Sequence, residues 1–96
     1  MELTSKDGNM VVDFYPVKDW SNNPINNLML KVLTFRGDTQ KKMIITRDEF
    51  NYQLKEYKDC KYKVTSEYMP PQFISKEELK WQFIDKLQIP MQQIVN

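Results

Sequence analysis

Few residues in this chain could carry out catalysis. The sequence contains no histidine and one cysteine, Cys60. Without an imidazole, the chain cannot form a Ser-His-Asp or Cys-His nucleophile system. Lysines beside a thiol favour its reactive form, and Lys58 and Lys61 lie close to Cys60 in the sequence, but Asp59 counters their charge and no base accompanies them. We interpret Cys60 as a buried or surface thiol without a catalytic role.

Metal and cofactor sites are disfavoured as well. One cysteine and no histidine leave carboxylates as the only strong ligands, which suit magnesium or calcium rather than zinc. The acidic pairs Asp48–Glu49 and Glu77–Glu78 lack calcium-loop spacing and fall in predicted first helical turns, where the helix dipole favours them. Two glycines are too few for a phosphate-binding loop. We expect no metal and no cofactor, and an enzyme would need a clustered acidic pocket that the linear sequence does not show.

The composition predicts one α+β domain over residues 1–96, with 41% hydrophobic residues and fraying at residues 1–9 and 91–96. Lys and Arg total 14 against 13 Asp and Glu, so the net charge of +1 gives no general attraction to nucleic acid or anionic membrane. The start, MELTSKD, lacks the features of a signal peptide, and no apolar run approaches the ~20 residues that span a bilayer. We expect a cytoplasmic protein without membrane association.

Two stretches, residues 45–54 and 74–83, repeat one pattern. Each has a capping box, in which Thr46 or Ser75 is followed three residues later by Glu, and apolar residues that can form a hydrophobic staple. Both devices mark helix starts. The match is consistent with a duplicated unit or with convergence on the same capping pattern, because the segments before the two stretches do not align.

Hydrophobic patterning completes a fold prediction. Proline and asparagine between residues 18 and 27 indicate a loop, and RGDTQ, in which Gly37 can take a positive φ, indicates a hairpin turn. The fold class that we predict is α+β, a small antiparallel or mixed sheet of three to four strands with two helices packed on one face, in the order β-β-β-α-β-α. The predicted strands are residues 10–17, 28–35, 41–46 and 60–68, and the predicted helices are residues 47–58 and 76–88, the second ended by Pro90.

Basic and aromatic residues are interleaved in the Lys/Tyr stretch of residues 52–63, and further cations surround the predicted hairpin turn. Acidic residues interrupt both groups, so a solvated charged face is the preferred interpretation. Tyr52 and Trp81 hold equivalent positions, about 200° around each helix from the inward stripe. We favour packing of both rings against the core or a loop, while an outward ring would be a partner anchor. The candidate partner-binding residues are Trp81, Tyr52, Arg36, Lys41, Lys42, Lys55 and Tyr62.

These features favour binding over catalysis. The first hypothesis is a small non-enzymatic protein-interaction module, such as a phage or mobile-element inhibitor or modulator that binds a host macromolecule. The alternative is a small nucleic-acid-binding regulator that uses the Lys/Tyr stretch of residues 52–63. A protein is the expected partner, and homodimerisation through an open sheet edge or the Trp81 face is compatible with it.

Overall fold

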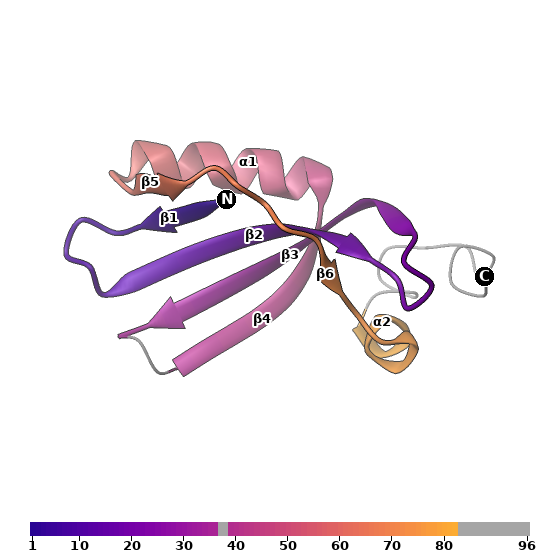
Figure 1. The fold of residues 1–96 in the computed structure, drawn as a ribbon. Helices are drawn as coiled ribbons and strands as arrows, with labels where there is room; N and C mark the ends of the chain where they lie inside the picture. The colour runs from indigo at the N-terminus through magenta and orange to yellow at the C-terminus, as the bar shows by residue number, and fades with distance from the viewer. Residues whose placement is uncertain (37–38, 83–96) are drawn as a thin grey trace.

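A computed structural model describes residues 1–36 and 39–82, the last three of them through their backbone alone. This part of the chain forms six strands and two helices (Figure 1). The elements are β1 (Glu2–Thr4), β2 (Met10–Lys18), β3 (Pro24–Phe35), β4 (Thr39–Thr46), α1 (Arg47–Asp59), β5 (Lys63–Ser66), β6 (Gln72–Phe73) and α2 (Lys76–Gln82).

The strands form one sheet, in which β4, β3, β2, β1 and β5 lie side by side in this order (Figure 1). Neighbours along this path are antiparallel, whereas β6 pairs in parallel with the end of β2. The two longest strands, β2 with 9 residues and β3 with 12, are rich in the β-branched and aromatic residues that suit a pleated sheet. The rest of the sheet is built on this central pair.

The strand β3 is buried on both faces of the sheet. Alternate side chains of a strand point to opposite faces, and Leu30 and Val32 lie in one apolar cluster while Met29 lies in the other. A near-continuous apolar run such as LMLKVL is typical of a strand covered on both sides. In the pairing of β3 with β4, Met29 lies opposite Ile45 and Leu30 lies opposite Ile44. The side chains of β4 are therefore divided between the same two apolar clusters.

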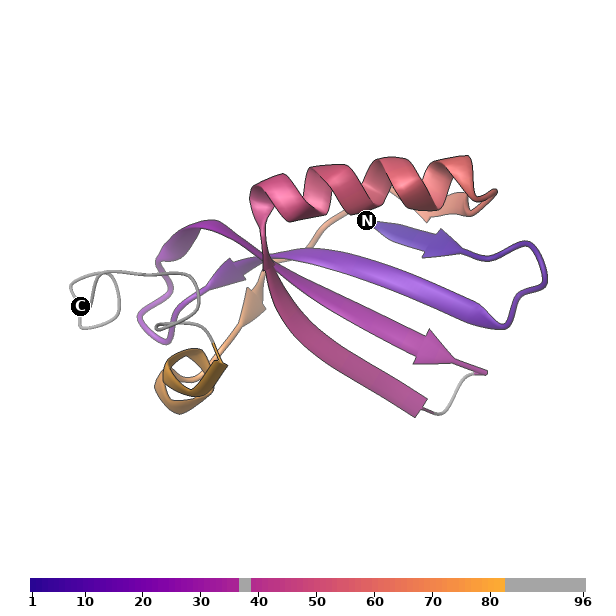
Figure 2. The same ribbon diagram turned by 180° about the vertical axis from the view of Figure 1, so that it is seen from behind.

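The helix α1 lies over one face of the sheet (Figure 2), and its backbone comes closest to β3 and β4. It begins after Thr46, whose hydroxyl oxygen accepts a hydrogen bond from the Glu49 N–H at 3.1 Å, and this confirms the predicted cap. Phe50 is buried, and its ring meets the ring of Phe14 edge-on with 4.8 Å between centroids. The helix ends at Asp59, close to the predicted end.

The helix α2 packs on the opposite face of the sheet. Ser75 caps it by accepting a hydrogen bond from the Glu78 N–H at 3.0 Å, which confirms the second predicted helix start. Leu79 is fully buried in the cluster that contains Leu30 and Val32. The predicted helix end at residue 88 lies outside the described residues, as does the tail expected to fray.

The predicted fold class, with two helices on one face of a sheet of three to four strands, is wrong. The described chain is mostly sheet, with six strands, one long helix, and a short second helix on the other face. The physical reason is the two-sided burial of β3, which requires a cover on each face. A periodic helix pattern shows which side of the helix is apolar but not which face of the sheet it meets.

Three segment predictions also need correction. Fraying over residues 1–9 does not hold for β1, where Leu3 is fully buried between β2 and β5. The loop predicted over residues 18–27 is shorter, because β3 begins at Pro24, and the strand predicted over residues 60–68 is reduced to β5. Short strands are stabilised by their neighbours and carry too few residues for a clear local pattern.

Candidate interaction surface

The helix α1 does not cover the whole of its face of the sheet. The first four residues of β4 are exposed and Met43 is half-buried, whereas Ile45 is buried. In β3, Leu33 packs at the border of the α1 cluster, and Phe35 on the same face is 36% exposed. We call this uncovered region the tip surface and define it by Met10, Leu33, Phe35, Lys41 and Met43.

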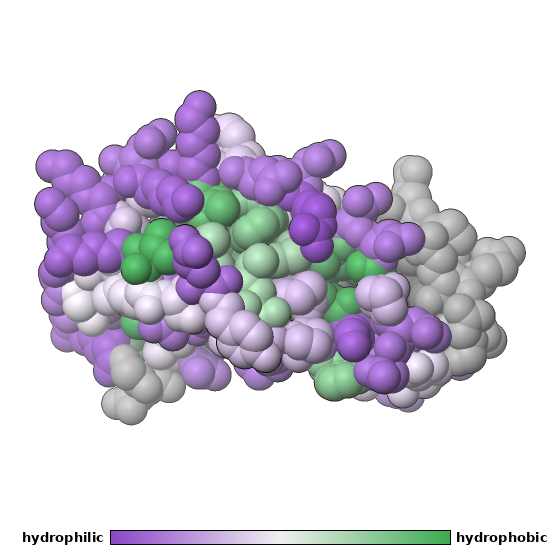
Figure 3. Space-filling view, turned by 45° about the horizontal axis from the view of Figure 1, so that its top comes forward, coloured by the Kyte–Doolittle hydropathy of each residue, from purple (hydrophilic) through white to green (hydrophobic). Residues whose placement is uncertain are grey.

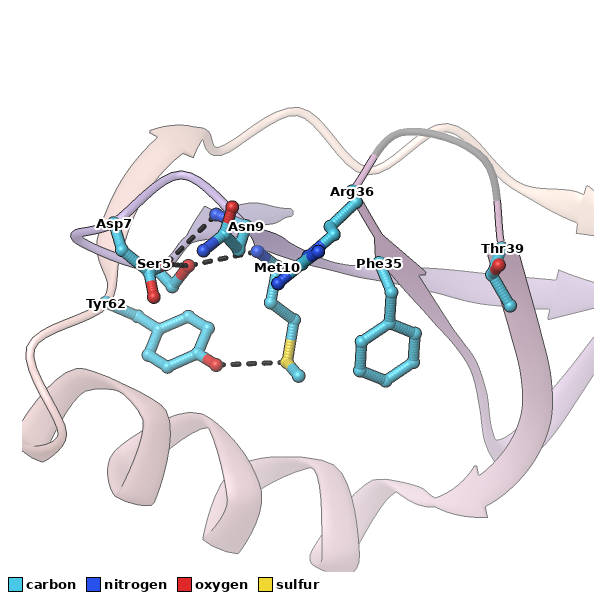
Figure 4. A pocket seen from close by; sticks show the side chains of 8 residues that line it. All are labelled: Ser5, Asp7, Asn9, Met10, Phe35, Arg36, Thr39 and Tyr62. Carbon is cyan, nitrogen blue, oxygen red and sulfur yellow. Dashed lines mark hydrogen bonds between the residues drawn. The ribbon is translucent and has the colours of Figure 1, made fainter.

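The turn between β1 and β2 forms one wall of a pocket beside the tip surface (Figure 4). Gly8 has a φ of +74°, which permits its N–H to bond the Ser5 carbonyl at 2.9 Å. The Asp7 carboxylate accepts bonds from the Ser5 hydroxyl at 2.6 Å and from the Asn9 N–H at 3.0 Å. The Ser5 bond is the main cause that lowers the pKa of Asp7 below its usual value. The Asn9 carbonyl in turn accepts the Arg36 N–H at 2.8 Å, which joins the two hairpin ends.

This tip pocket encloses about 310 Å³. Tyr62 bounds it on the α1 side, where its hydroxyl donates to the Met10 sulfur at 3.0 Å. The side chains of Met10, Phe35 and Tyr62 point into the same space (Figure 4). The lining therefore combines apolar and aromatic groups with the guanidinium of Arg36. The lining residues are Ser5, Asp7, Asn9, Met10, Phe35, Arg36, Thr39 and Tyr62.

A second pocket of about 520 Å³, the helix pocket, shares Tyr62 with the tip pocket. The buried Lys31 contributes its ammonium to this pocket. The ammonium donates to the Gln53 amide oxygen at 2.5 Å and lies 5.0 Å from the centroid of the Tyr57 ring. The Gln53 amide nitrogen donates in turn to the Glu49 carboxylate at 2.9 Å. Because its charge is met by an amide and a ring face, Lys31 acts as a bridge between β3 and α1. The lining residues are Lys31, Glu49, Gln53, Glu56, Tyr57, Cys60 and Tyr62.

Carboxylates gather at one place on the opposite face, where Glu2 pairs with Asp13 across β1 and β2. Burial, and then the charge of Glu2, raises the pKa of the Asp13 carboxyl. Burial, followed by the charge of Asp13, raises the pKa of the Tyr15 hydroxyl. The Thr65 hydroxyl donates to Glu2 at 2.8 Å. Within residues 1–36 and 39–82, no three acidic or thiol groups come together in a way that could hold a metal ion.

The structure brings two of the predicted contact residues together, because Arg36 and Tyr62 both line the tip pocket. Lys41 is exposed on the tip surface, opposite Leu33. Lys42 is also exposed, but it projects to the other face of the sheet, as neighbouring residues of a strand do. The cations predicted around the hairpin turn therefore do not form one group. Lys41 lies on one face of the sheet, Lys42 lies on the other, and Arg36 lines the tip pocket.

The Lys/Tyr stretch does not form one surface. Tyr57 and Tyr62 are half-buried and meet edge-on with 4.9 Å between ring centroids. Tyr52 is 62% exposed, so the expectation that its ring packs against the core or a loop is wrong. A hydrogen bond with Glu56 is the main cause that raises the pKa of the Tyr52 hydroxyl. Lys55 is exposed on α1. The side chain of Trp81, whose backbone belongs to α2, lies outside what the structure describes.

Sequence reasoning did not select Met10 and Phe35, which line the tip pocket. Phe35 lies two residues after Leu33, so both side chains point to the same face of β3, and Phe35 is the last residue of the strand. Assigning the strand residues to the two faces would therefore have placed Phe35 beyond the covered core. Figure 3 shows one face on which hydrophobic side chains gather between hydrophilic ones. Exposed apolar residues outside the tip surface include Trp20, Val64, Tyr68 and Phe73.

Comparison of this chain with protein-family models, with curated proteins and with solved structures returns no match. Among the described residues, no helix has the length and apolar character needed to cross a membrane. Function is therefore inferred from the chain's own residues.

Proposed function

We propose that this chain is a non-enzymatic protein-interaction module and that the tip surface is its contact surface. The observation that carries this proposal is the exposed ring of Phe35, which lies with the half-buried Met10 and Met43 beside the exposed cations Arg36 and Lys41. Protein interfaces combine an apolar centre with a polar rim, and aromatic residues, Met and Arg are enriched in them. The other exposed apolar side chains are not part of either pocket described above.

The form of this function that we propose is inhibition or modulation by occupation of a partner's site. Such action needs neither a nucleophile nor a cofactor, and it requires only a rigid scaffold that presents a few side chains. The turn bonds around Asp7 and the Lys31 bridge supply that rigidity on both sides of the tip surface. Small proteins that phages and mobile elements encode against a host protein act in this way, and size and composition are the basis for this analogy.

The test is capture of a partner from cells of the natural source by the immobilised protein. We expect one protein to be recovered by the wild type and lost with Phe35→Ser. Phe73→Ser is the matched control, because it makes the same change at an exposed ring outside the tip surface. Circular dichroism serves to check that both variants remain folded. Equal recovery by the two variants would remove Phe35 from the contact surface.

The alternative function, nucleic-acid binding through residues 52–63, has a different signature. It predicts a gel shift with DNA or RNA that weakens steeply with salt, because phosphate contacts release counterions. Phe35→Ser would leave that shift unchanged, while Lys58→Glu and Lys61→Glu would reduce it. This pattern, without a captured protein, would replace the protein-interaction proposal.

A further inference from the structure

The strand β4 is the longer of the two edge strands in the described sheet. It pairs with β3 on one side, and no strand in the described part of the chain pairs with its other side. Alternate residues of an edge strand direct their N–H and C=O groups outward. β4 has 8 residues, whereas β5 at the opposite edge has 4. β4 is therefore the edge that offers more hydrogen-bonding groups to an added strand.

This edge carries positive charge along its length. Lys41 and Lys42 are adjacent, exposed, and directed to opposite faces of the sheet. Arg36 before the strand and Arg47 after it are exposed too, and Thr39–Thr46 contains no acidic residue. Within residues 1–36 and 39–79, no carboxylate forms an ion pair with these four cations. An incoming strand thus meets an exposed lysine on each face of the sheet, Lys41 on one and Lys42 on the other.

We propose that the β4 edge binds an acidic, extended segment of a partner protein, which adds to the sheet as an antiparallel strand. The inference rests on the proposed function as a protein-interaction module and specifies the chemistry of the partner. Residues directly opposite each other in antiparallel strands share a face. Carboxylates opposite Lys41 and Lys42 therefore pair on the two faces, and an apolar residue opposite the half-buried Met43 extends onto the tip surface.

A second copy of this chain fits the same edge less well. Two β4 strands paired antiparallel about the midpoint of Thr39–Thr46 would place Lys42 of each copy diagonal to Lys41 of the other. Like charges at such positions destabilise a strand pair. Lysines on edge strands commonly prevent self-association, and here the same lysines attract a strand that carries carboxylates. The edge thereby distinguishes an acidic partner from the chain itself.

The first test uses a short labelled peptide with strand-forming residues, Glu opposite Lys41 and Lys42, and Val opposite Met43. Fluorescence anisotropy with the full chain should show saturable binding, weakened about tenfold or more by the double variant Lys41→Glu/Lys42→Glu, because two attractions become repulsions. A peptide with Lys in place of Glu should bind that variant better than the wild type. The control variant Lys55→Glu/Lys58→Glu changes charge equally on α1 and should alter binding by about twofold at most.

The second test distinguishes strand addition from charge attraction. N-methylation at alternate peptide residues removes N–H groups that face β4 in one set and solvent in the other, so one set should abolish binding and the other should preserve it. Equal effects of the two sets, or equal binding by wild type and the Lys41→Glu/Lys42→Glu variant, would overturn the inference. Absence of peptide binding would also overturn it. Phe35-dependent capture of a partner would in that case still support the proposed function. Failure of both peptide binding and Phe35-dependent capture would remove both the strand-addition inference and the proposed function.

Discussion

Replacing Phe14 by Leu is expected to lower the free energy of unfolding by about 2–4 kcal/mol. Phe14 is fully buried, and its ring lies 4.8 Å from that of Phe50 and 6.3 Å from that of Tyr57, both in inclined arrangements. Two such aromatic pairs contribute about 1–3 kcal/mol beyond apolar burial. The smaller side chain leaves part of the ring volume empty, which costs about 1 kcal/mol more. At about 0.05–0.15 kcal/mol per residue, the whole chain has about 5–14 kcal/mol, so the variant remains folded.

Urea denaturation followed by circular dichroism measures this loss. With an m value of about 1.5 kcal/mol/M, the midpoint should fall by about 1.3–2.7 M. Phe73→Leu is the matched control, because this ring is 61% exposed on β6 and its shift should stay below about 0.3 M. Equal shifts in the two variants would refute the packing of α1 on β2 through Phe14.

Three further predictions concern local hydrogen bonds and charge. Thr46→Ala removes the cap of α1 and should lower the free energy of unfolding by about 0.5–2 kcal/mol in a urea titration. Asp19→Ala removes the buried carboxylate that accepts the N–H groups of Ser21 and Asn23, both at 2.9 Å, and should cost about 1–3 kcal/mol by thermal or urea unfolding. Asp13→Asn should raise the free energy of unfolding at neutral pH, because burial and the charge of Glu2 disfavour the ionised carboxyl in the folded state.

The sign of the Asp13 effect follows from linkage. A carboxyl whose pKa is raised by folding binds its proton more tightly in the folded state. The ionised Asp13 therefore lowers the free energy of unfolding by its full amount at pH values above its folded-state pKa. This destabilisation is relieved as the pH falls through that pKa towards about 4, the usual pKa of an Asp carboxyl. The stabilisation by Asp13→Asn, measured in urea at several pH values, should therefore shrink between neutral pH and about pH 4. A difference that does not change with pH would show that Asp13 titrates alike in both states.

Conservative variants serve as controls for the two hydrogen-bond predictions. Thr46→Ser retains the hydroxyl acceptor and should keep most of the stability that Thr46→Ala loses. Asp19→Asn retains an oxygen acceptor for the two N–H groups and should cost less than Asp19→Ala. If the alanine and conservative variants were equally destabilised at either position, the assigned hydrogen bond would not be the source of the loss.

Much of the local structure could be predicted because its signals lie within a few residues. The caps at Thr46 and Ser75 act over three residues, and the β3 and β4 pairing follows two strand-forming runs joined by a short turn. By contrast, β1 was missed, since a strand of 3 residues is defined by its pairing with β2 and β5. The candidate surface was predicted only in part. Arg36 and Tyr62 were selected from charge and aromatic patterns, but their meeting in one pocket depends on the packing of α1 against the sheet.

The helix starts, the pairing of β3 with β4 and the scarcity of catalytic groups could be read from the sequence, because capping, strand propensity and residue chemistry act locally. Three features became apparent only in three dimensions: the two helices lie on opposite faces, the Lys31 ammonium lies over the Tyr57 ring, and no strand in the described part of the chain pairs with the outer side of β4. These outcomes depend on which apolar faces are buried against each other. That choice minimises the exposed apolar area of the whole chain, and no local pattern specifies it.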